Sequence, residues 1–168
     1  MHDKKFIIEG LAYNIYEASI YNLGEGHLSY MIQLIDKLYN PINNKAFSVG
    51  KQIICEYIGA ILHKYMNDKY KLDLVSYLQE VFLKNVDVWG FIISYSNLIT
   101  DDYPNNSKLQ TRLVQIIKEY CFSKKYAVTK IPLTKLINDL LYLNVTLGVT
   151  TSYHKEPYDN IKFIEAEE

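Results

Sequence analysis

The predicted fold depends on one stretch, Val88-Trp89-Gly90-Phe91-Ile92-Ile93-Ser94-Tyr95, which is apolar at nearly every position. A helix that is apolar all round is expected to be buried all round. The β-branched and aromatic residues of this stretch would also suit a strand. Because the apolar run continues to Ile99 and its neighbours have helical patterns, we predict a central buried helix over about 88–100.

The segments on both sides of this stretch repeat apolar residues every three or four positions, which is the spacing of amphipathic helices. Polar, glycine-containing or proline-containing breaks separate the segments, and three of these breaks lie at 85–87, 101–107 and 123–129. The sequence therefore predicts an all-α fold, a bundle of about seven helices of which the segment over about 88–100 is the central one. The predicted helices cover about 6–22, 27–39, 45–66, 70–85, 88–100, 107–121 and 132–146.

Length and composition predict a single domain. The chain has 168 residues, of which 49% are hydrophobic and 22% charged, and a chain of this size can bury a substantial core without disulfides or metals. We assign residues 1–150 to one helical domain and residues 151–168 to a polar C-terminal tail.

Charge and hydropathy argue against two classes of partner. The formal net charge is −1, so the chain lacks the basic footprint of a nucleic-acid-binding protein or of a protein that binds anionic membranes. Neither a secretory leader nor an apolar run of the roughly 18 residues needed for a membrane helix is recognisable.

The motifs of common enzyme classes are also missing from the sequence. It contains no GxSxG, HExxH, Walker A or GxGxxG motif. The four histidines are scattered, and Cys55 and Cys121 lie far apart in apolar patterns, where buried free thiols are expected. The sequence therefore predicts a protein that is not an enzyme, with no cofactor and no metal site.

One stretch, Glu80 to Tyr95, resembles the first homology region of the Bcl-2 family. That region reads approximately E-L-F-x-x-G-x-N-W-G-R-[IV]-[VL]-[AS]-[FL] and joins the fourth helix of the fold to its buried fifth helix. The residues that match it are Glu80, Val81, Phe82, Trp89, Gly90, Ile92, Ile93 and Ser94. With this incomplete motif and its lysine-rich composition, in which Arg112 is the single arginine, the chain is similar to the virus-encoded members of the family, especially those of poxviruses.

The resemblance implies a function in host apoptosis. Members of this family bind the amphipathic BH3 helix of pro-apoptotic proteins, such as Bax, Bak and the BH3-only protein Bim, in a groove made by helices two to five. It implies a protein of the host cytoplasm that reaches the mitochondrial outer membrane through its partners, with a homodimer as an alternative assembly. Trp89 would anchor the central helix. The expected groove residues are Tyr57, Ile61, Tyr65, Tyr77, Leu78, Val81, Lys84, Val88, Gly90, Phe91, Ser94 and Leu98.

The match departs from the family pattern in three places. Val88 replaces the asparagine before the tryptophan, Phe91 replaces the arginine after the glycine, and one extra residue separates Phe82 from Trp89. In the family, that arginine pairs with an aspartate of the bound helix. The resemblance thus leaves this aspartate without its usual partner, and Lys84 is one candidate to replace it.

Two alternatives remain open at this stage. The same fold with a closed or shortened groove would act as an adaptor that inhibits innate immune signalling without binding BH3 helices. The second alternative is an unrelated α-helical protein or a small enzyme.

Overall fold

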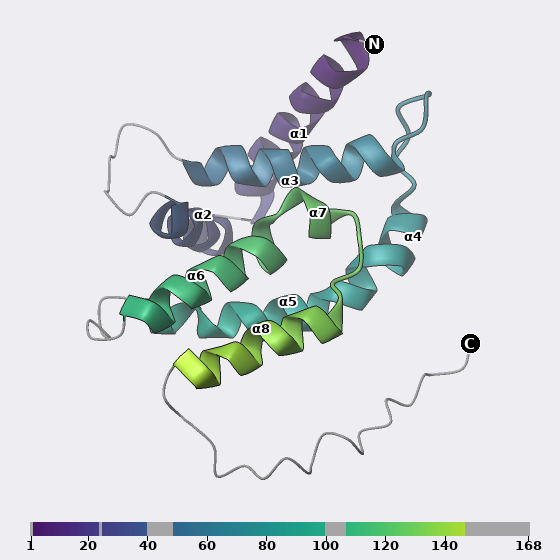
Figure 1. Ribbon diagram of the computed structural model, residues 1–168. Coiled ribbons are helices and arrows are strands. Elements are labelled where there is room, and N and C mark those ends of the chain that lie inside the picture. The colour runs from purple at the N-terminus through teal and green to yellow at the C-terminus, as the bar shows by residue number, and fades with distance from the viewer. Residues whose placement is uncertain (1, 24, 40–48, 100–106, 147–168) are drawn as a thin grey trace.

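The structure, a computed structural model, describes residues 2–23, 25–39, 49–99 and 107–146 (Figure 1). Within these ranges the chain is helical and forms no β-strand beyond one isolated bridge between Met66 and Leu72. The predicted all-α class is confirmed, whereas the predicted tail over 151–168 lies outside the described residues. The elements are α1 (His2–Leu23), α2 (Glu25–Tyr39), α3 (Val49–Tyr65), α4 (Leu74–Tyr77), the π-helical turn η1 (Leu78–Phe82), α5 (Leu83–Ser94), the 3₁₀ turn η2 (Tyr95–Ile99), α6 (Ser107–Phe122), α7 (Lys124–Ala127) and α8 (Leu133–Thr146).

The most deeply buried helix is α6, which lies between α3 on one side and α5 and α8 on the other (Figure 1). Its residues Leu113, Ile116, Ile117, Tyr120 and Cys121 are each at most 2% exposed. They form the main core together with apolar side chains of α2, α5, α7 and α8. The centre of the molecule is therefore an amphipathic helix, and its partners cover it from several directions.

The prediction that the segment 88–100 is the central buried helix is wrong. Its buried face, led by Ile92, packs on the core, but Gly90 and Ser94 are exposed and Phe91 is 50% exposed. The reason is that α5 covers α6 with one face only, so the apolar residues on its other faces remain at the surface. A helix with apolar residues on all of its faces can be buried on every side, or it can bury one face and expose a second apolar one. The sequence alone does not distinguish these two cases.

The predicted break at Asn85-Val86-Asp87 is also wrong, because the chain is helical without interruption from Leu74 to Ile99. Asn85 does not break the helix, since its side chain bonds to the backbone of a distant segment. One wide turn interrupts the regular α-helical pitch: the backbone N–H of Leu83 bonds to the carbonyl of Leu78 across η1. Such π-turns hold one residue more than an α-turn.

A glycine allows α2 and α3 to approach each other closely. A Cβ atom at Gly50 would lie 2.8 Å from the carbonyl oxygen of Ile32, so only glycine fits at this crossing. The backbone N–H of Gly50 donates to the Asp36 carboxylate at 2.7 Å. These contacts fix the two helices that form one wall of the groove described below.

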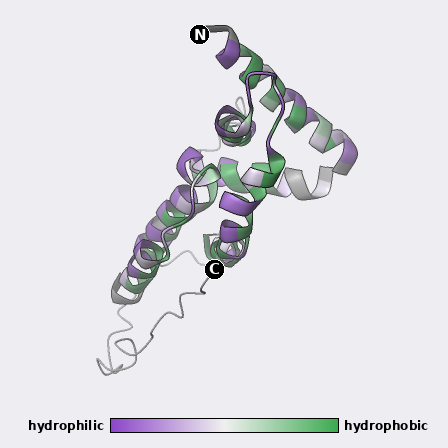
Figure 2. Ribbon diagram, turned by 90° about the vertical axis from the view of Figure 1, so that its right-hand side faces the viewer, coloured by the Kyte–Doolittle hydropathy of each residue, from purple (hydrophilic) through white to green (hydrophobic). Residues whose placement is uncertain are grey.

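A second, smaller core joins α1 to α3. Ile8 and Ala12 of α1 pack against Leu62 and Met66, and the opposite side of α1 faces outward. On that side Tyr21 is 88% exposed, and hydrophobic and hydrophilic residues mix along the length of the helix (Figure 2).

The polar break predicted over 123–129 contains the short helix α7. The hydroxyl of Ser123 accepts the backbone N–H of Tyr126 and thereby caps this turn at its N-terminus. Tyr126 and Ala127 are buried, so this segment belongs to the core despite its polar neighbours.

Candidate binding groove

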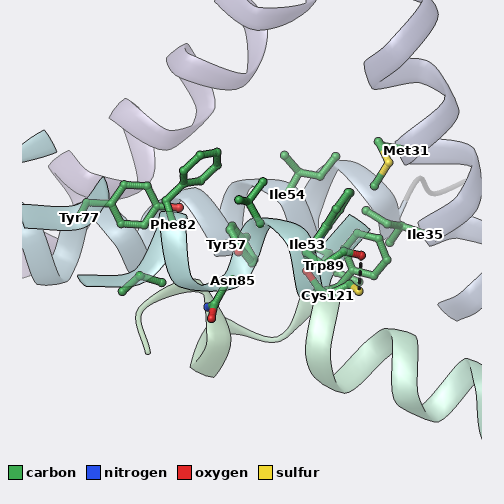
Figure 3. A pocket seen from close by; sticks show the side chains of 13 residues that line it. Met31, Ile35, Ile53, Ile54, Tyr57, Tyr77, Phe82, Asn85, Trp89 and Cys121 are labelled. Carbon is green, nitrogen blue, oxygen red and sulfur yellow. Dashed lines mark hydrogen bonds between the residues drawn. The ribbon is translucent and has the colours of Figure 1, made fainter. Parts of the chain in front are cut away.

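An apolar groove of about 360 Å³ opens between α2, α3, η1 and α5, with the C-terminal end of α6 at its floor (Figure 3). Tyr77 and Phe82 lie towards one end and Met31 and Ile35 towards the other, with Tyr57 between them. Among the residues that the structure describes, none of the side chains that line it is charged. The lining residues are Met31, Ile35, Ile53, Ile54, Tyr57, Tyr77, Val81, Phe82, Asn85, Val86, Trp89, Cys121 and Phe122.

One face of the continuous η1–α5 helix forms a wall of the groove. Phe82, Asn85, Val86 and Trp89 follow the i, i+3, i+4, i+7 spacing that places residues on one side of a helix. Gly90 lies one turn beyond Val86 in the same row. A Cβ atom at Gly90 would meet no atom within 4 Å, so the surface beside the groove is open at this point.

Trp89 joins this wall to the end of α6. Its indole Nε1–H donates to the carbonyl oxygen of Cys121 at 3.1 Å, and its ring meets Phe122 edge-to-face with ring centres 6.4 Å apart. Trp89 is half-buried and packs against the main core. The same side chain therefore holds α5 on α6 and contributes to the lining of the groove.

Asn85 is the buried polar residue of the groove wall, and all of its hydrogen-bonding groups are used. Its amide nitrogen donates to the carbonyl oxygens of Tyr126 and Thr129, at 3.2 and 2.9 Å. Its amide oxygen accepts the backbone N–H of Ile131 at 2.9 Å. These three bonds fasten the segment between α7 and α8 to α5.

Three tyrosines cluster where α3 meets α4. The hydroxyl of Tyr65 donates to Glu80 at 2.9 Å, and the rings of Tyr65 and Tyr77 meet edge-to-face at 5.5 Å. Burial raises the pKa of Tyr57 and of Tyr77 above the ordinary value of a tyrosine. Both hydroxyls therefore keep their protons at neutral pH.

Of the groove residues predicted from the sequence, Tyr57, Tyr77 and Val81 line this pocket. The structure places the remaining ones outside its lining. Tyr65 is buried behind Tyr77, while Ile61, Leu78, Val88 and Leu98 are half-buried. The exposed residues of the set are Lys84, Gly90, Phe91 and Ser94.

Helix geometry explains where Lys84 and Phe91 lie. Lys84 comes two residues before Val86 and Phe91 two residues after Trp89, so each is rotated by about 200° from its groove-lining neighbour. Phe91 instead packs edge-to-face against Tyr95, with ring centres 5.3 Å apart. Neither residue is thus placed to meet a helix bound in the groove.

Several lining residues were missed from the sequence, most importantly Phe82, Asn85 and Val86 of the α5 wall. Their spacing with Trp89 is the signal that could have found them, but the break assumed at 85–87 concealed it. Residues from α2 and from the end of α6 had no such signal, because only the packing of the helices brings them to the groove. Those residues are Met31, Ile35, Cys121 and Phe122.

The two cysteines are free thiols. Cys121 is buried, as predicted, and burial raises its pKa. The prediction of a buried thiol is wrong for Cys55, which is half-buried because it lies on a face of α3 that is only partly covered. In the described part of the chain, no three His, Cys, Asp or Glu side chains are grouped so that they could hold a metal ion.

No helix among the described residues is long and apolar enough to cross a membrane. Comparisons with protein-family models, with curated proteins and with solved structures found no match to this chain.

Proposed function

We propose that the chain is a Bcl-2-like inhibitor of host apoptosis that sequesters the BH3 helices of pro-apoptotic proteins such as Bax, Bak and Bim. The observation that carries the proposal is the apolar groove between α2, α3, η1 and α5. It lies at the stretch of sequence that resembles the first homology region of the family. An amphipathic helix would lay its apolar face in such a groove.

Two further features support this proposal. Trp89 and Gly90, the central residues of the resemblance, stand at the groove wall and at its open edge. The chain is helical without interruption from Phe82 to Trp89, so the extra residue between them does not break the helix that forms the groove wall.

Calorimetry with a panel of BH3 peptides tests the proposal. We expect dissociation constants between about micromolar and nanomolar, equivalent to roughly −8 to −12 kcal/mol. Gly90→Glu should abolish binding, because a glutamate there would occupy the open edge that an incoming helix needs. Gly10→Glu is the matched control, since Gly10 is also an exposed helical glycine with open space at its Cβ position, but it lies on α1. The proposal fails if no BH3 peptide binds at high micromolar concentration.

One observation favours the adaptor as a second candidate. Leu133, Ile137 and Leu141 follow each other at four-residue spacing on α8 and are 42%, 39% and 44% exposed. This row is an apolar surface separate from the lining of the groove. An adaptor that does not bind BH3 helices would use such a surface. It would be identified if Ile137→Glu abolished the inhibition of signalling while Gly90→Glu left that inhibition unchanged.

A further inference from the structure

Most polar groups in the lining of the groove are already engaged. The amide of Asn85 makes three hydrogen bonds to the backbone, and the indole N–H of Trp89 is bonded to Cys121. The Cys121 thiol lies 3.9 Å from the carbonyl oxygen of Trp89. These groups can offer little to a bound molecule without breaking contacts that hold the fold.

The hydroxyls of Tyr57 and Tyr77 differ from the rest of the lining. Among the described residues, neither hydroxyl has a hydrogen-bond partner, although both side chains line the groove. Tyr57 comes from α3 and Tyr77 from α4, and both side chains belong to the lining of the same groove (Figure 3). They therefore form a pair of free donors within an otherwise apolar surface.

We infer that Tyr57 and Tyr77 together form the polar recognition point of the groove, where their hydroxyls donate to a carboxylate on the bound helix. This inference rests on the proposed function, and it assigns to two neutral donors a role that a cation would otherwise fill. Hydrogen bonds from hydroxyls to a carboxylate are short and strong. In the described part of the chain no charged side chain lines the groove, and Lys84 is turned away from it.

Over the described residues, the lining offers hydroxyl donors but no carboxylate, so it suits a bound carboxylate better than a bound ammonium group. A bound ammonium would find no carboxylate in the lining, whereas a bound carboxylate finds two hydroxyl donors that keep their protons at neutral pH. The other positions of the occupant must be apolar, since a second polar group would be buried without a partner.

A pair of small probes tests the recognition point without any peptide. 2-Naphthoate and 2-naphthylmethylammonium have similar apolar area and opposite charge. NMR on protein with a ¹⁵N-labelled Trp89 indole, which lines the same groove, reports their binding in the wild type and in every variant. We expect naphthoate to bind at least about fivefold more tightly than the ammonium. Tyr57→Phe with Tyr77→Phe should remove that preference, while Tyr21→Phe on exposed α1 should leave it unchanged. Equal binding of both probes, or a preference that survives in the double variant, would overturn the inference.

A peptide experiment then separates the inference from the proposed function. A Bim BH3 peptide and its Asp→Ala form are titrated into the wild type, the Tyr57→Phe/Tyr77→Phe variant and Lys84→Ala. In the wild type and in Lys84→Ala, we expect the Asp→Ala change to weaken binding about tenfold. In the double variant, we expect no difference between the peptides.

If both peptides bind and the tenfold difference persists in the double variant, the inference is wrong and the proposed function stands. If neither peptide binds but naphthoate does so through the two hydroxyls, the proposed function is wrong and the recognition point stands.

Discussion

Asn85 connects the groove wall to a segment that lies 41 to 46 residues further along the chain. It bonds to the backbone of Tyr126, Thr129 and Ile131 from within α5. Asn85→Ala would leave buried backbone groups without partners, and each such group costs about 1–3 kcal/mol. We therefore expect the free energy of unfolding to fall by about 3 kcal/mol in urea titrations. A change as small as that of Asn14→Ala on exposed α1, expected within about 0.5 kcal/mol, would contradict this role.

Trp89 combines a packing role with a lining role. Trp89→Ala removes the hydrogen bond to Cys121 and the contact with Phe122. Because the side chain is half-buried, we expect a loss near the lower end of the roughly 3–5 kcal/mol typical of large aromatic truncations in cores. Trp89→Phe should recover part of this loss. An unchanged melting temperature in Trp89→Ala would show that α5 is held on α6 by other contacts.

Among the elements, the π-turn η1 sets which face of α5 meets the groove. Deleting Gln79, an exposed residue inside this turn, should convert it to a regular α-turn and leave the helices on both sides nearly in register. Deletion of the exposed Gln52 is the control, because it lies in the regular α-helix α3. This deletion rotates the part of α3 before it by about 100° relative to the part after it. Circular dichroism with thermal melts should show a cooperative transition for the first variant and its loss for the second. Equal damage by the two deletions would argue against a tolerated extra residue in η1.

The pairing of α6 with α8 depends on a polar cluster at their interface. Asp139 pairs with Arg112 and accepts hydrogen bonds from Tyr120 at 2.6 Å and from Lys135 at 3.3 Å. Burial raises the pKa of Asp139, but these hydrogen bonds and the charges of Lys135 and Arg112 outweigh burial and hold the pKa below its ordinary value. The ionised carboxylate therefore stabilises the folded chain.

The sign of this pKa shift gives a pH dependence. The stabilisation is fully present above the pKa of the unfolded aspartate, about 4, and is lost as the pH falls through the lower pKa of the folded state. We expect the urea midpoint to drop on acidification below about pH 4. Asp139→Asn should be less stable at pH 7 and less sensitive to this acidification. If the variant retains the full acid dependence, other carboxylates are responsible for it.

On the scale of the whole molecule, the sequence predicted the helices but not their places in the bundle. The spacing of apolar residues identified α2, α3, α6 and α8 because it reports locally which face of a helix is covered. It could not tell that α6 lies at the centre and α5 at the side of a groove, since both arrangements bury an apolar face. That difference depends on contacts between helices far apart in the chain.

The groove was predictable to a similar degree. Tyr57, Tyr77 and Val81 were found because they lie on helix faces next to the recognised stretch. Asn85 was interpreted as a helix breaker, since its long-range partners leave no mark in the local sequence. Cys121 and Phe122 reach the groove only through the packing of α6 against α5.

The most direct test of the account uses Trp89, the only tryptophan of the chain and a residue of the groove lining. Its fluorescence is followed while a tryptophan-free BH3 peptide from Bak is titrated into the wild type, Gly90→Glu and Gly10→Glu. We expect a saturable shift of the emission to shorter wavelength in the wild type and in Gly10→Glu, because a bound helix would shield the indole from water. In Gly90→Glu we expect no shift. An emission spectrum that stays constant in all three proteins, or that shifts equally in Gly90→Glu, would contradict binding in the groove.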